Sequence, residues 1–376
     1  MKYFDFAATC PISNEALQAY IKASQDYYGN TKSLHDVGTK ADTLVEYCRT
    51  TLAGLLGADP QGLTFTSGGT ESNMIAIHSL AEASKGRHII ISAGEHSSIK
   101  NVTTKLSKQG FIVSEVPLTK EGIVNLEELK RLIREDTSLI SIQHVNSDIG
   151  SINPIEKIHK ICKENDILLH SDCVQSFGKI DLSTFSSLVD SFTISSHKIY
   201  GPKGVGALYI HPSISILPFL PNVTHENGIR PGTLNTPGIA AFTTAANERL
   251  SNLPRCQDHF QQLKKEFFKN LNARNHRVEV LGSNVASSIP IIGICIKEMN
   301  SQHVLLEANR IGYSFSTGSA CQSKSNGPSP TLLSMGISEE KAATFLRISF
   351  GMEQTLEDVR SLAEDLLEIL LHSGRP

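Results

Sequence analysis

The sequence of 376 residues contains no tryptophan and no long apolar run. Its apolar stretches, such as residues 89–91, fall far short of the ~20 residues that a membrane-spanning helix needs. Residues 1–6 show no basic region followed by an apolar core, so a signal peptide is not expected. The chain has 35 basic and 38 acidic residues and no basic block, which argues against a nucleic-acid partner. We therefore expect a soluble cytoplasmic protein with no membrane partner.

Cysteine is also scarce, and its spacing fits neither a disulfide framework nor a zinc site. The seven residues are Cys10, Cys48, Cys162, Cys173, Cys256, Cys295 and Cys321. Their number is odd and no two form a C-x-x-C pair, so no metal is expected. Six of them lie in or near stretches with helix or strand patterns and should be buried. Cys321 lies instead in a small, polar stretch that we interpret as a loop.

Strand-like and helix-like stretches alternate along the first two-thirds of the chain. The predicted strands are 63–66, 88–92, 111–117, 139–145, 167–171, 192–195 and 206–210. The predicted helices are 71–83, 97–109, 126–133 and 154–164. Strands separated by helices pair in parallel and are covered on both faces. The pattern therefore predicts an α/β fold with a mostly parallel sheet.

The pattern changes after about residue 250, where a smaller α+β domain is expected. Its predicted helices are 255–270, 303–309 and 356–372, and its strands are 278–281, 289–296 and 347–349. Residues 317–330 form the predicted polar loop. We divide the chain into an N-terminal segment, 1–15, which packs with the small domain, a large domain, 16–250, and the small C-terminal domain, 251–376.

Three segments at the ends of predicted strands could carry chemistry. The glycine-rich turn at 66–70 could bind a phosphate through backbone N–H groups, or it could be a tight turn with Thr70 as a helix N-cap. Lys198 follows a buried strand and is either a Schiff-base amine or a surface lysine. Asp172 lies where α/β folds place ligands, or it is an N-cap. Together they are the parts that a pyridoxal-phosphate (PLP) enzyme requires.

Ordered motifs along the whole chain resemble the cysteine desulfurases, PLP enzymes of the class V aminotransferase group. The motifs are YFDFAAT at 3–9, GNTKSLH at 29–35, TSGGTESN at 66–73, EH at 95–96, SSHK at 195–198, RPGT at 230–233 and GSAC at 318–321. The resemblance implies PLP fold type I and conversion of L-cysteine to L-alanine. The length of the loop and its Ser-Ala-Cys form resemble the branch with a long loop.

The resemblance also implies roles for single residues. The cofactor-binding set would be Gly69, Thr70, His96, Ser147, Asp172, Gln175, Ser195, His197, Lys198 and Thr233. Lys198 would hold PLP covalently and later move protons, and Asp172 would pair with the pyridine nitrogen. Gln175 would contact the phenolic oxygen, and His96 would stack on the ring and act as an acid or base. Thr233 would reach the phosphate of a neighbouring subunit, which implies a homodimer.

On the substrate side, the resemblance implies that Arg347 and Asn30 bind L-cysteine and that Cys321 is the nucleophile. Cys321 would carry the sulfur as a persulfide to a protein acceptor, which could be an iron–sulfur scaffold, a thiolation protein or a dedicated client. Ser147 departs from the asparagine that is usual in the family. Two rival functions remain open. One is an aminotransferase or lyase acting on another amino acid, and the other is an inactive sulfur-transfer scaffold.

Overall fold

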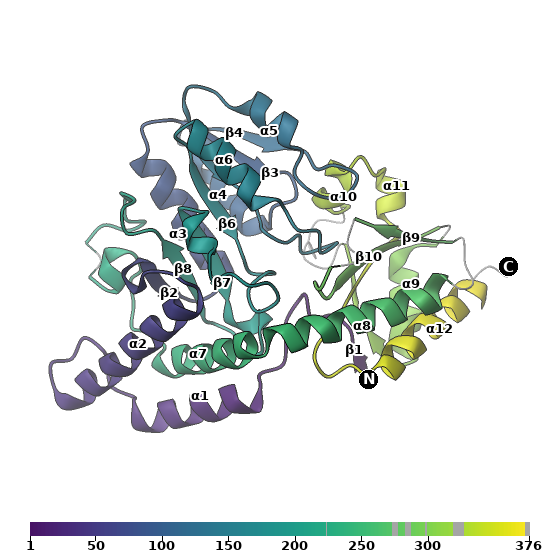
Figure 1. Cartoon of the computed structure of the whole chain (residues 1–376), viewed down its shortest axis with the longest axis horizontal. Coiled ribbons are helices and arrows are strands. Elements are labelled where there is room, and N and C mark those ends of the chain that lie inside the picture. Colours follow the sequence, from purple (N-terminus) through teal and green to yellow (C-terminus); the bar gives the residue numbers. More distant parts are fainter. Residues whose placement is uncertain (223, 273–276, 283–286, 298, 319–326, 373–376) are drawn as a thin grey trace.

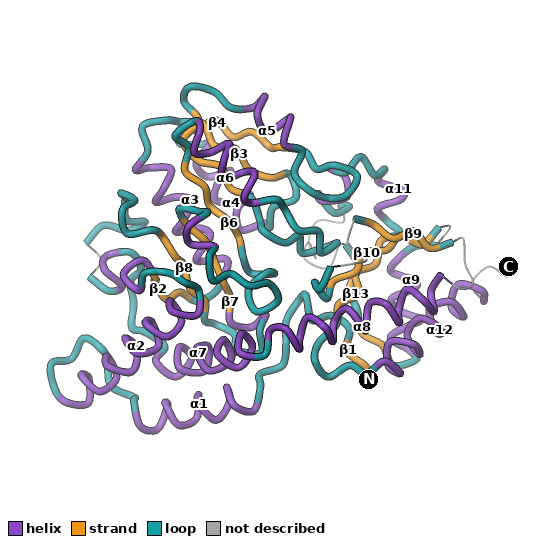
Figure 2. Tube along the Cα trace, in the orientation of Figure 1, coloured by secondary structure: helices purple, strands orange, loops and turns teal. Residues whose placement is uncertain are grey.

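The computed structural model (Figure 1) describes the chain except for residues 223, 273–276, 283–286, 298, 319–326 and 373–376. Cys321 and most of the predicted polar loop therefore lie outside the described residues. Among the described residues, no helix is long and apolar enough to cross a membrane. The architecture is α/β, with two main sheets that Figure 2 shows side by side.

The larger sheet has seven strands in the order β2-β8-β7-β6-β5-β3-β4. Their bounds are β2 Leu63–Thr66, β3 His88–Ser92, β4 Ile112–Val116, β5 Thr137–Ser141, β6 Leu168–Asp172, β7 Ser191–Ser195 and β8 Gly206–Ile210. Four pairings, from β4 to β7 through β3, β5 and β6, are parallel. Every residue of β2, β3, β5, β7 and β8 is buried, which agrees with a sheet covered on both faces.

Strand β8 is the exception to the predicted parallel pairing. It runs antiparallel to both of its neighbours, β7 and β2. Only residues 196–205 separate β7 from β8, and this stretch contains no crossover α-helix. A parallel return needs a connection of about a dozen residues or more, usually a helix. Because the connection is short, β8 runs antiparallel to β7. Strand β2, which is antiparallel to β8, therefore runs in the same direction as the other five strands.

Helices cover both faces of the larger sheet. Their bounds are α1 Asn14–Asp26, α2 Asp36–Leu55, α3 Gly69–Ala83, α4 Ser97–Ser107, α5 Leu126–Leu132, α6 Ile155–Glu164 and α7 Thr236–Ser251. α1 packs against α7, α7 packs against α2, and α3 packs against α4. The predictions for α3, α4, α5 and α6 are confirmed to within a few residues, whereas α1, α2 and α7 were not predicted.

The second sheet has the strand order β12-β13-β10-β9 and is antiparallel throughout. Its strands are β9 Val278–Leu281, β10 Ile291–Ile296, β12 Ser316–Thr317 and β13 Phe345–Ser349. The accompanying helices are α8 Leu253–Asn272, α9 Ser301–Arg310, α10 Pro330–Ser334, α11 Glu339–Ala342 and α12 Leu356–His372. Helices α8 and α12 pack on each other and share a buried apolar cluster with this sheet. The presence of two separate sheets favours a domain boundary near residue 250, and this boundary stays a prediction.

The N-terminal segment lies against the smaller sheet, as Figure 1 shows. Its strand β1, Lys2–Tyr3, pairs in parallel with β11, Tyr313–Ser314. Phe4 is fully buried in the apolar cluster of α8 and α12. Beyond Phe4 the segment crosses to the larger sheet, where the N–H of Cys10 donates to the carbonyl of His197 at 2.8 Å. The segment thus contacts both parts of the molecule.

Candidate active site

A cavity of about 290 Å³ lies at the carboxyl ends of the larger sheet. Ten residues predicted from the sequence line it: Gly69, Thr70, His96, Ser147, Asp172, Gln175, Ser195, His197, Lys198 and Arg347. They converge because β2 leads directly into α3, β6 ends at Asp172 and β7 ends at Ser195. The carboxyl ends of parallel strands meet at one edge of a sheet, which is where open α/β folds bind ligands. Arg347 comes from β13 of the smaller sheet.

The first turn of α3 forms one end of this cavity. Gly68 is the N-cap residue, and its φ of 145° lies in a region that favours glycine. Gly68 has no side chain with which to cap the helix. Because α3 begins at Gly69, Thr70 lies inside its first turn, and the alternative that Thr70 is the N-cap is wrong. The hydroxyl of Ser195 is buried and has no partner within the described structure. An uncapped helix N-terminus beside an unpaired hydroxyl suits an anion.

His197 lines the same cavity as a neutral ring. Its Nδ1 is 3.1 Å from the hydroxyl of Thr9. Burial, helped by the positive charge of Lys198, lowers the pKa of His197 to about 4. At neutral pH the imidazole is therefore uncharged and can donate one hydrogen bond without carrying a charge of its own.

Lys198 lines the cavity from the turn that follows β7. Its Nζ donates to the carbonyl oxygens of Ala7 at 2.6 Å and Ala8 at 2.7 Å. Both acceptors belong to the N-terminal segment, so that segment holds the amine at the cavity wall. The alternative of an ordinary surface lysine is wrong for this position.

Asp172 and Gln175 lie on the same wall, and protein groups fix their orientation. Asp172 Oδ1 accepts from the N–H of Val174 at 2.9 Å, and Oδ2 accepts from the side-chain amide of Asn73 at 2.7 Å. Gln175 donates from Nε2 to the carbonyl of Ala7 at 2.8 Å. The Nζ of Lys179, four residues further on, donates to Gln175 Oε1 at 3.2 Å. Burial lowers the pKa of Lys179 to about 7.

Arg347 closes the cavity from the smaller sheet. Its Nη2 lies 2.9 Å from Oδ1 of Asp5, and its Nη1 donates to the carbonyl of Ser147 at 3.2 Å. The two charged side chains are mostly buried, with exposed fractions of 5% for Arg347 and 19% for Asp5. Asp5 thereby orients the guanidinium, whose planar fork suits a carboxylate ligand.

We expect Asp5→Ala to destabilise the protein strongly, because the change leaves the charge of Arg347 buried without its carboxylate partner. Breaking a buried ion pair in this way costs about 3 kcal/mol or more. The matched control is Lys2→Ala, which removes a more exposed pair, Lys2–Asp358, from the same segment. An exposed pair contributes about 1 kcal/mol or less. Urea unfolding of both variants checks this, and equal losses would contradict the orienting role of Asp5.

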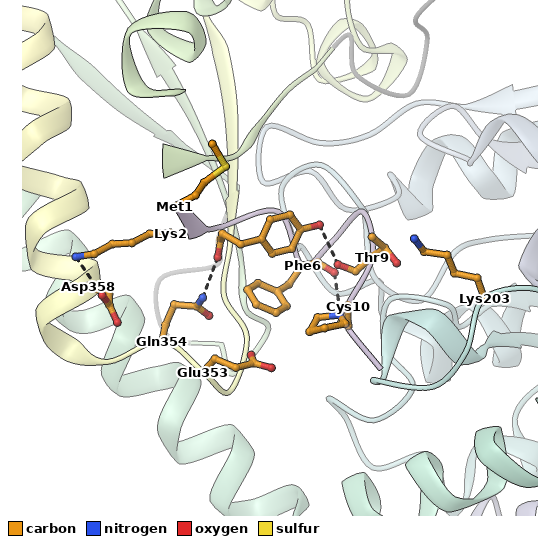
Figure 3. Close-up of a pocket in the computed structure, with 11 residues that line it drawn as sticks. Met1, Lys2, Phe6, Thr9, Cys10, Lys203, Glu353, Gln354 and Asp358 are labelled. Carbon is orange, nitrogen blue, oxygen red and sulfur yellow. Dashed lines mark hydrogen bonds and ion pairs between the residues drawn. The ribbon is translucent and has the colours of Figure 1, made fainter. Parts of the chain in front are cut away.

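An ion pair and a hydrogen bond hold the other side of the N-terminal segment in place (Figure 3). Lys2 pairs with Asp358 at 3.1 Å, and Gln354 donates from Nε2 to the carbonyl of Tyr3 at 2.8 Å. The hydroxyl of Tyr3 donates to the carbonyl of Thr9 at 3.0 Å, which bends the segment back on itself. A second cavity of about 570 Å³ is lined by this face of the segment. The bend presents the carbonyls of Ala7 and Ala8 to Lys198.

Three predicted residues are not among those that line the cavity in the described structure. Asn30 is exposed, and its Oδ1 accepts from the N–H of Lys32 at 3.0 Å. Thr233 is exposed in the segment that leads to α7. Cys321 lies outside the described residues. The roles of these three residues stay predictions.

The structure explains what Ser147 and its neighbour do. Asn146 does not take the place of the asparagine usual at 147, because its Oδ1 accepts from the N–H groups of Asp148 and Ile149 within a turn. Its Nδ2 donates to the hydroxyl of Thr331 at 3.2 Å. Ser147 lines the cavity, and its carbonyl oxygen accepts a hydrogen bond from Nη1 of Arg347. A short hydroxyl therefore occupies a position at which the family usually has an amide.

The comparisons with known proteins agree with this geometry. The family model described as aminotransferase class-V matches residues 2–362. A Bacillus subtilis protein named "Putative cysteine desulfurase NifS" is 43% identical over 96% of this chain and 93% of its own length. Cysteine desulfurase IscS of Dictyoglomus turgidum is 36% identical over 99% of this chain and 95% of its own.

Solved structures give the same result. A structure titled "NIFS-LIKE PROTEIN" superposes with a TM-score of 0.91 at 31% identity, and 99% of each chain is covered. The chain belongs to the cysteine desulfurase family. Another similar solved structure is titled "SspA in complex with cysteine", with a TM-score of 0.81, 31% identity and coverage of 93% of this chain and 99% of that one.

Cysteine desulfurases of the class V group depend on PLP, and the cavity fits that cofactor. The unpaired hydroxyl of Ser195 and the uncapped first turn of α3 suit its phosphate. Lys198 supplies a primary amine and Asp172 a carboxylate on the walls of the same cavity. A Cβ on Gly69 would lie 2.8 Å from a methyl group of Val174, so the turn is packed as closely as its glycine allows.

Sequence reasoning singled out the pair Glu95-His96 but gave Glu95 no role. Its carboxyl group is buried, Oε1 accepts from the N–H of Gln143 at 2.6 Å, and Oε2 has no partner within the described structure. Burial, and then the negative charge of Asp172, raises the pKa of Glu95 well above its ordinary value of 4.5. The folded protein therefore keeps this carboxyl protonated at pH values at which the unfolded chain ionises it.

We expect Glu95→Gln to stabilise the protein at neutral pH. Because the folded pKa is raised, the stability that Glu95 contributes is fully present below pH 4.5 and is lost as the pH rises toward the folded pKa. The loss can reach about 1.4 kcal/mol per pH unit, and a glutamine avoids it. Urea unfolding of both proteins at pH 4 and pH 7.5 measures the difference. A difference that does not grow with pH would show that Glu95 ionises normally.

Proposed function

We propose that this protein is a PLP-dependent cysteine desulfurase that converts L-cysteine to L-alanine. Sulfur is transferred to the thiol of Cys321, and the balance is L-cysteine plus thiol giving L-alanine plus persulfide. The observation that carries the proposal is the convergence of Lys198, Asp172 and Arg347 on one cavity of a family member. An amine, a carboxylate and a guanidinium at one site are the groups that amino-acid chemistry with PLP needs.

In this proposal each wall of the cavity holds a different part of the cofactor. The first turn of α3, with Gly69 and Thr70, binds the phosphate together with Ser195 and His197. Asp172 would pair with the pyridine nitrogen, and Gln175 would donate to the phenolic oxygen. PLP, when bound, supplies an electron sink for bonds to the α-carbon of the amino acid. Lys198 and His96 hold and move protons at the rim, through Nζ and the ring nitrogens.

Arg347 is the proposed carboxylate-binding group for L-cysteine. Its fork is already oriented by Asp5 and by the carbonyl of Ser147. A bidentate contact with the substrate carboxylate would position the amino group and the thiol relative to Lys198. The shorter side chain of Ser147 leaves more room beside this contact than an asparagine would.

The described residues on both sides of Cys321 support its proposed role. In β12, Ser316 pairs with Arg347 of β13. On the other side, the hydroxyl of Ser329 donates to Oδ2 of Asp148 at 2.6 Å, next to Ser147. Both ends of the segment that contains Cys321 are therefore attached at the rim of the cavity. In the proposal, the thiol of Cys321 takes the substrate sulfur and then passes it to an outside acceptor.

A second copy of the chain is the proposed partner of Thr233. Arg230 pairs with Glu71 at 3.2 Å, which holds the segment with Thr233 against the first turn of α3, on the outside of the cavity. Tyr28 and Leu34 have exposed fractions of 73% and 101%, which suits an interface with a second copy. Sedimentation equilibrium should give the mass of a homodimer. The cytoplasmic location and the identity of the sulfur acceptor, including a scaffold for iron–sulfur assembly, stay predictions.

The test incubates the PLP-loaded protein with L-cysteine and quantifies the products. Alanine should form in equal amount to sulfane sulfur, with an added mass of one sulfur on the peptide that contains Cys321. Pyruvate and ammonia in place of alanine would show a lyase, and a keto acid that depends on an amino acceptor would show an aminotransferase. No product from a protein that binds PLP would favour the scaffold.

A further inference from the structure

A chain of hydrogen bonds joins two cavity residues that do not touch each other in the described contacts, Asp172 and His96. Its centre is Asn73 of α3, which is 1% exposed. Asn73 donates from Nδ2 to Oδ2 of Asp172 at 2.7 Å and to the hydroxyl oxygen of Ser98 at 3.0 Å. The hydroxyl of Ser98 lies 2.8 Å from Nδ1 of His96. Three elements, α3, β6 and the start of α4, thus share one buried link.

The chemistry of Asp172 fixes the direction of the bonds in this chain. An ionised carboxylate only accepts, so the atom of Asn73 that faces it is the amide nitrogen. That amide has two hydrogens, and the second goes to the oxygen of Ser98. Since Ser98 accepts there, its own hydroxyl hydrogen is available for Nδ1 of His96. The ring nitrogen Nδ1 then accepts, and a ring with one hydrogen carries it on Nε2.

A backbone contact gives the same assignment for His96. His96 is the N-cap residue of α4, and its Nδ1 accepts from the N–H of Ser98 at 3.2 Å. A hydrogen on Nδ1 would meet this donor directly. Two donors therefore point at the same ring nitrogen, and Nε2–H is left for the cavity that His96 lines.

A second branch holds Asn73 in the orientation that the chain needs. Its Oδ1 lies 3.2 Å from Nε2 of His170, whose Nδ1 lies 3.0 Å from the hydroxyl of Ser191. His170 is fully buried, and burial lowers its pKa to about 3, so its ring is neutral. Because Oδ1 of Asn73 faces Nε2, this neutral ring donates through Nε2 and accepts at Nδ1, which is consistent with the orientation of the Asn73 amide.

We propose that Asn73 is a positioning residue that couples the ionised carboxylate of Asp172 to the Nε2–H tautomer of His96. In the proposed function this tautomer offers a proton at the rim of the cavity while Asp172 remains oriented toward the pyridine nitrogen. Asn73 acts through its two neighbours and is not itself a proton donor. The use of this tautomer rests on the proposed function, whereas the hydrogen bonds that fix the tautomer do not depend on it.

The experiment measures the ring nitrogens of His96 by 15N NMR in cofactor-free protein at neutral pH. A His96→Gln sample identifies the signals. We expect a single Nε2–H tautomer in the unmodified protein and a mixture of tautomers in Asn73→Ala. Ser98→Ala removes the hydroxyl donor and leaves only the longer backbone N–H contact at 3.2 Å on Nδ1, so it should also shift the ring toward a mixture of tautomers. The control is Ser79→Ala, a buried serine of the same helix α3 whose hydroxyl has no partner within the described structure.

The same variants are then loaded with PLP for kinetics. We expect kcat with L-cysteine to fall about five-fold in Ser98→Ala, the size of one lost neutral hydrogen bond, with KM unchanged. An Nδ1–H tautomer in the unmodified protein would overturn the proposal. So would a tautomer that stays the same in both Asn73→Ala and Ser98→Ala. If Asn73→Ala does not fold, Ser98→Ala alone decides. The NMR result stands even if the protein does not desulfurise cysteine.

Discussion

Lys198→Ala should abolish the formation of alanine and remove the visible absorbance of covalently bound PLP. Lys198 is the one lysine among the described residues that line the cavity. Another lysine behind the wall, Lys179, is buried with an exposed fraction of 5% and donates to Gln175. No other described side chain in the cavity offers a primary amine, so the covalent link to the cofactor is lost with the substitution.

Lys203→Ala is the matched control for this prediction. Lys203 is five residues further along the same turn, is exposed, and lines the second cavity (Figure 3). Its removal should leave both the absorbance and the rate of alanine formation close to the unmodified values. Full activity in Lys198→Ala, without any added amine, would refute the assignment of Lys198 as the cofactor-binding lysine.

Short apolar runs, such as residues 89–91 of β3, allowed most of the sheet to be predicted, because strands covered on both faces are rich in apolar residues. The predicted bounds of β3 and β8 are those of the structure. The strand predicted at 139–145 is an instructive error, since β5 ends at Ser141. Gln143 and Val145 remain buried but line the cavity. An apolar run shows burial and does not show where the ladder ends.

Helix α7 could not be predicted for a related reason. Residues 238–243 of α7 are all buried, so this part of the helix has no polar face and its sequence lacks the 3.6-residue period. The antiparallel direction of β8, by contrast, could have been predicted. Only residues 196–205 separate the predicted strands 192–195 and 206–210, and a parallel return needs about a dozen residues or more.

The cavity residues also divide into those that the sequence could indicate and those that it could not. Lys198 and Asp172 could be predicted because each directly follows a predicted strand. Asn73 follows Gly69 by four residues on α3, so the two lie on one helix face, and this spacing could have indicated it. Asp5 and Lys179 could not be found from the sequence, because their roles depend on contacts with residues far along the chain or on burial. The first lies 342 positions from Arg347.

The largest functional effect outside the cofactor site is expected for Cys321→Ser. This variant should bind PLP and L-cysteine as before, since those steps use Lys198, Asp172 and Arg347. It should form no alanine and no persulfide, because serine has no thiol to take the sulfur. The visible spectrum should respond to added L-cysteine, whereas mass spectrometry should find no added sulfur on the peptide that contains residue 321.

The other six cysteines argue for this outcome. All six are buried in the described structure. Burial raises the pKa of the thiols of Cys10, Cys48, Cys162, Cys173 and Cys295, which lowers the fraction of attacking thiolate. Cys10 is the sharpest control, because its sulfur lies 3.4 Å from the carbonyl of Lys198 and yet its thiol is buried. Cys10→Ser should keep the rate. If Cys321→Ser still formed alanine at the unmodified rate, Cys321 would not be the sulfur acceptor and the lyase alternative would be favoured.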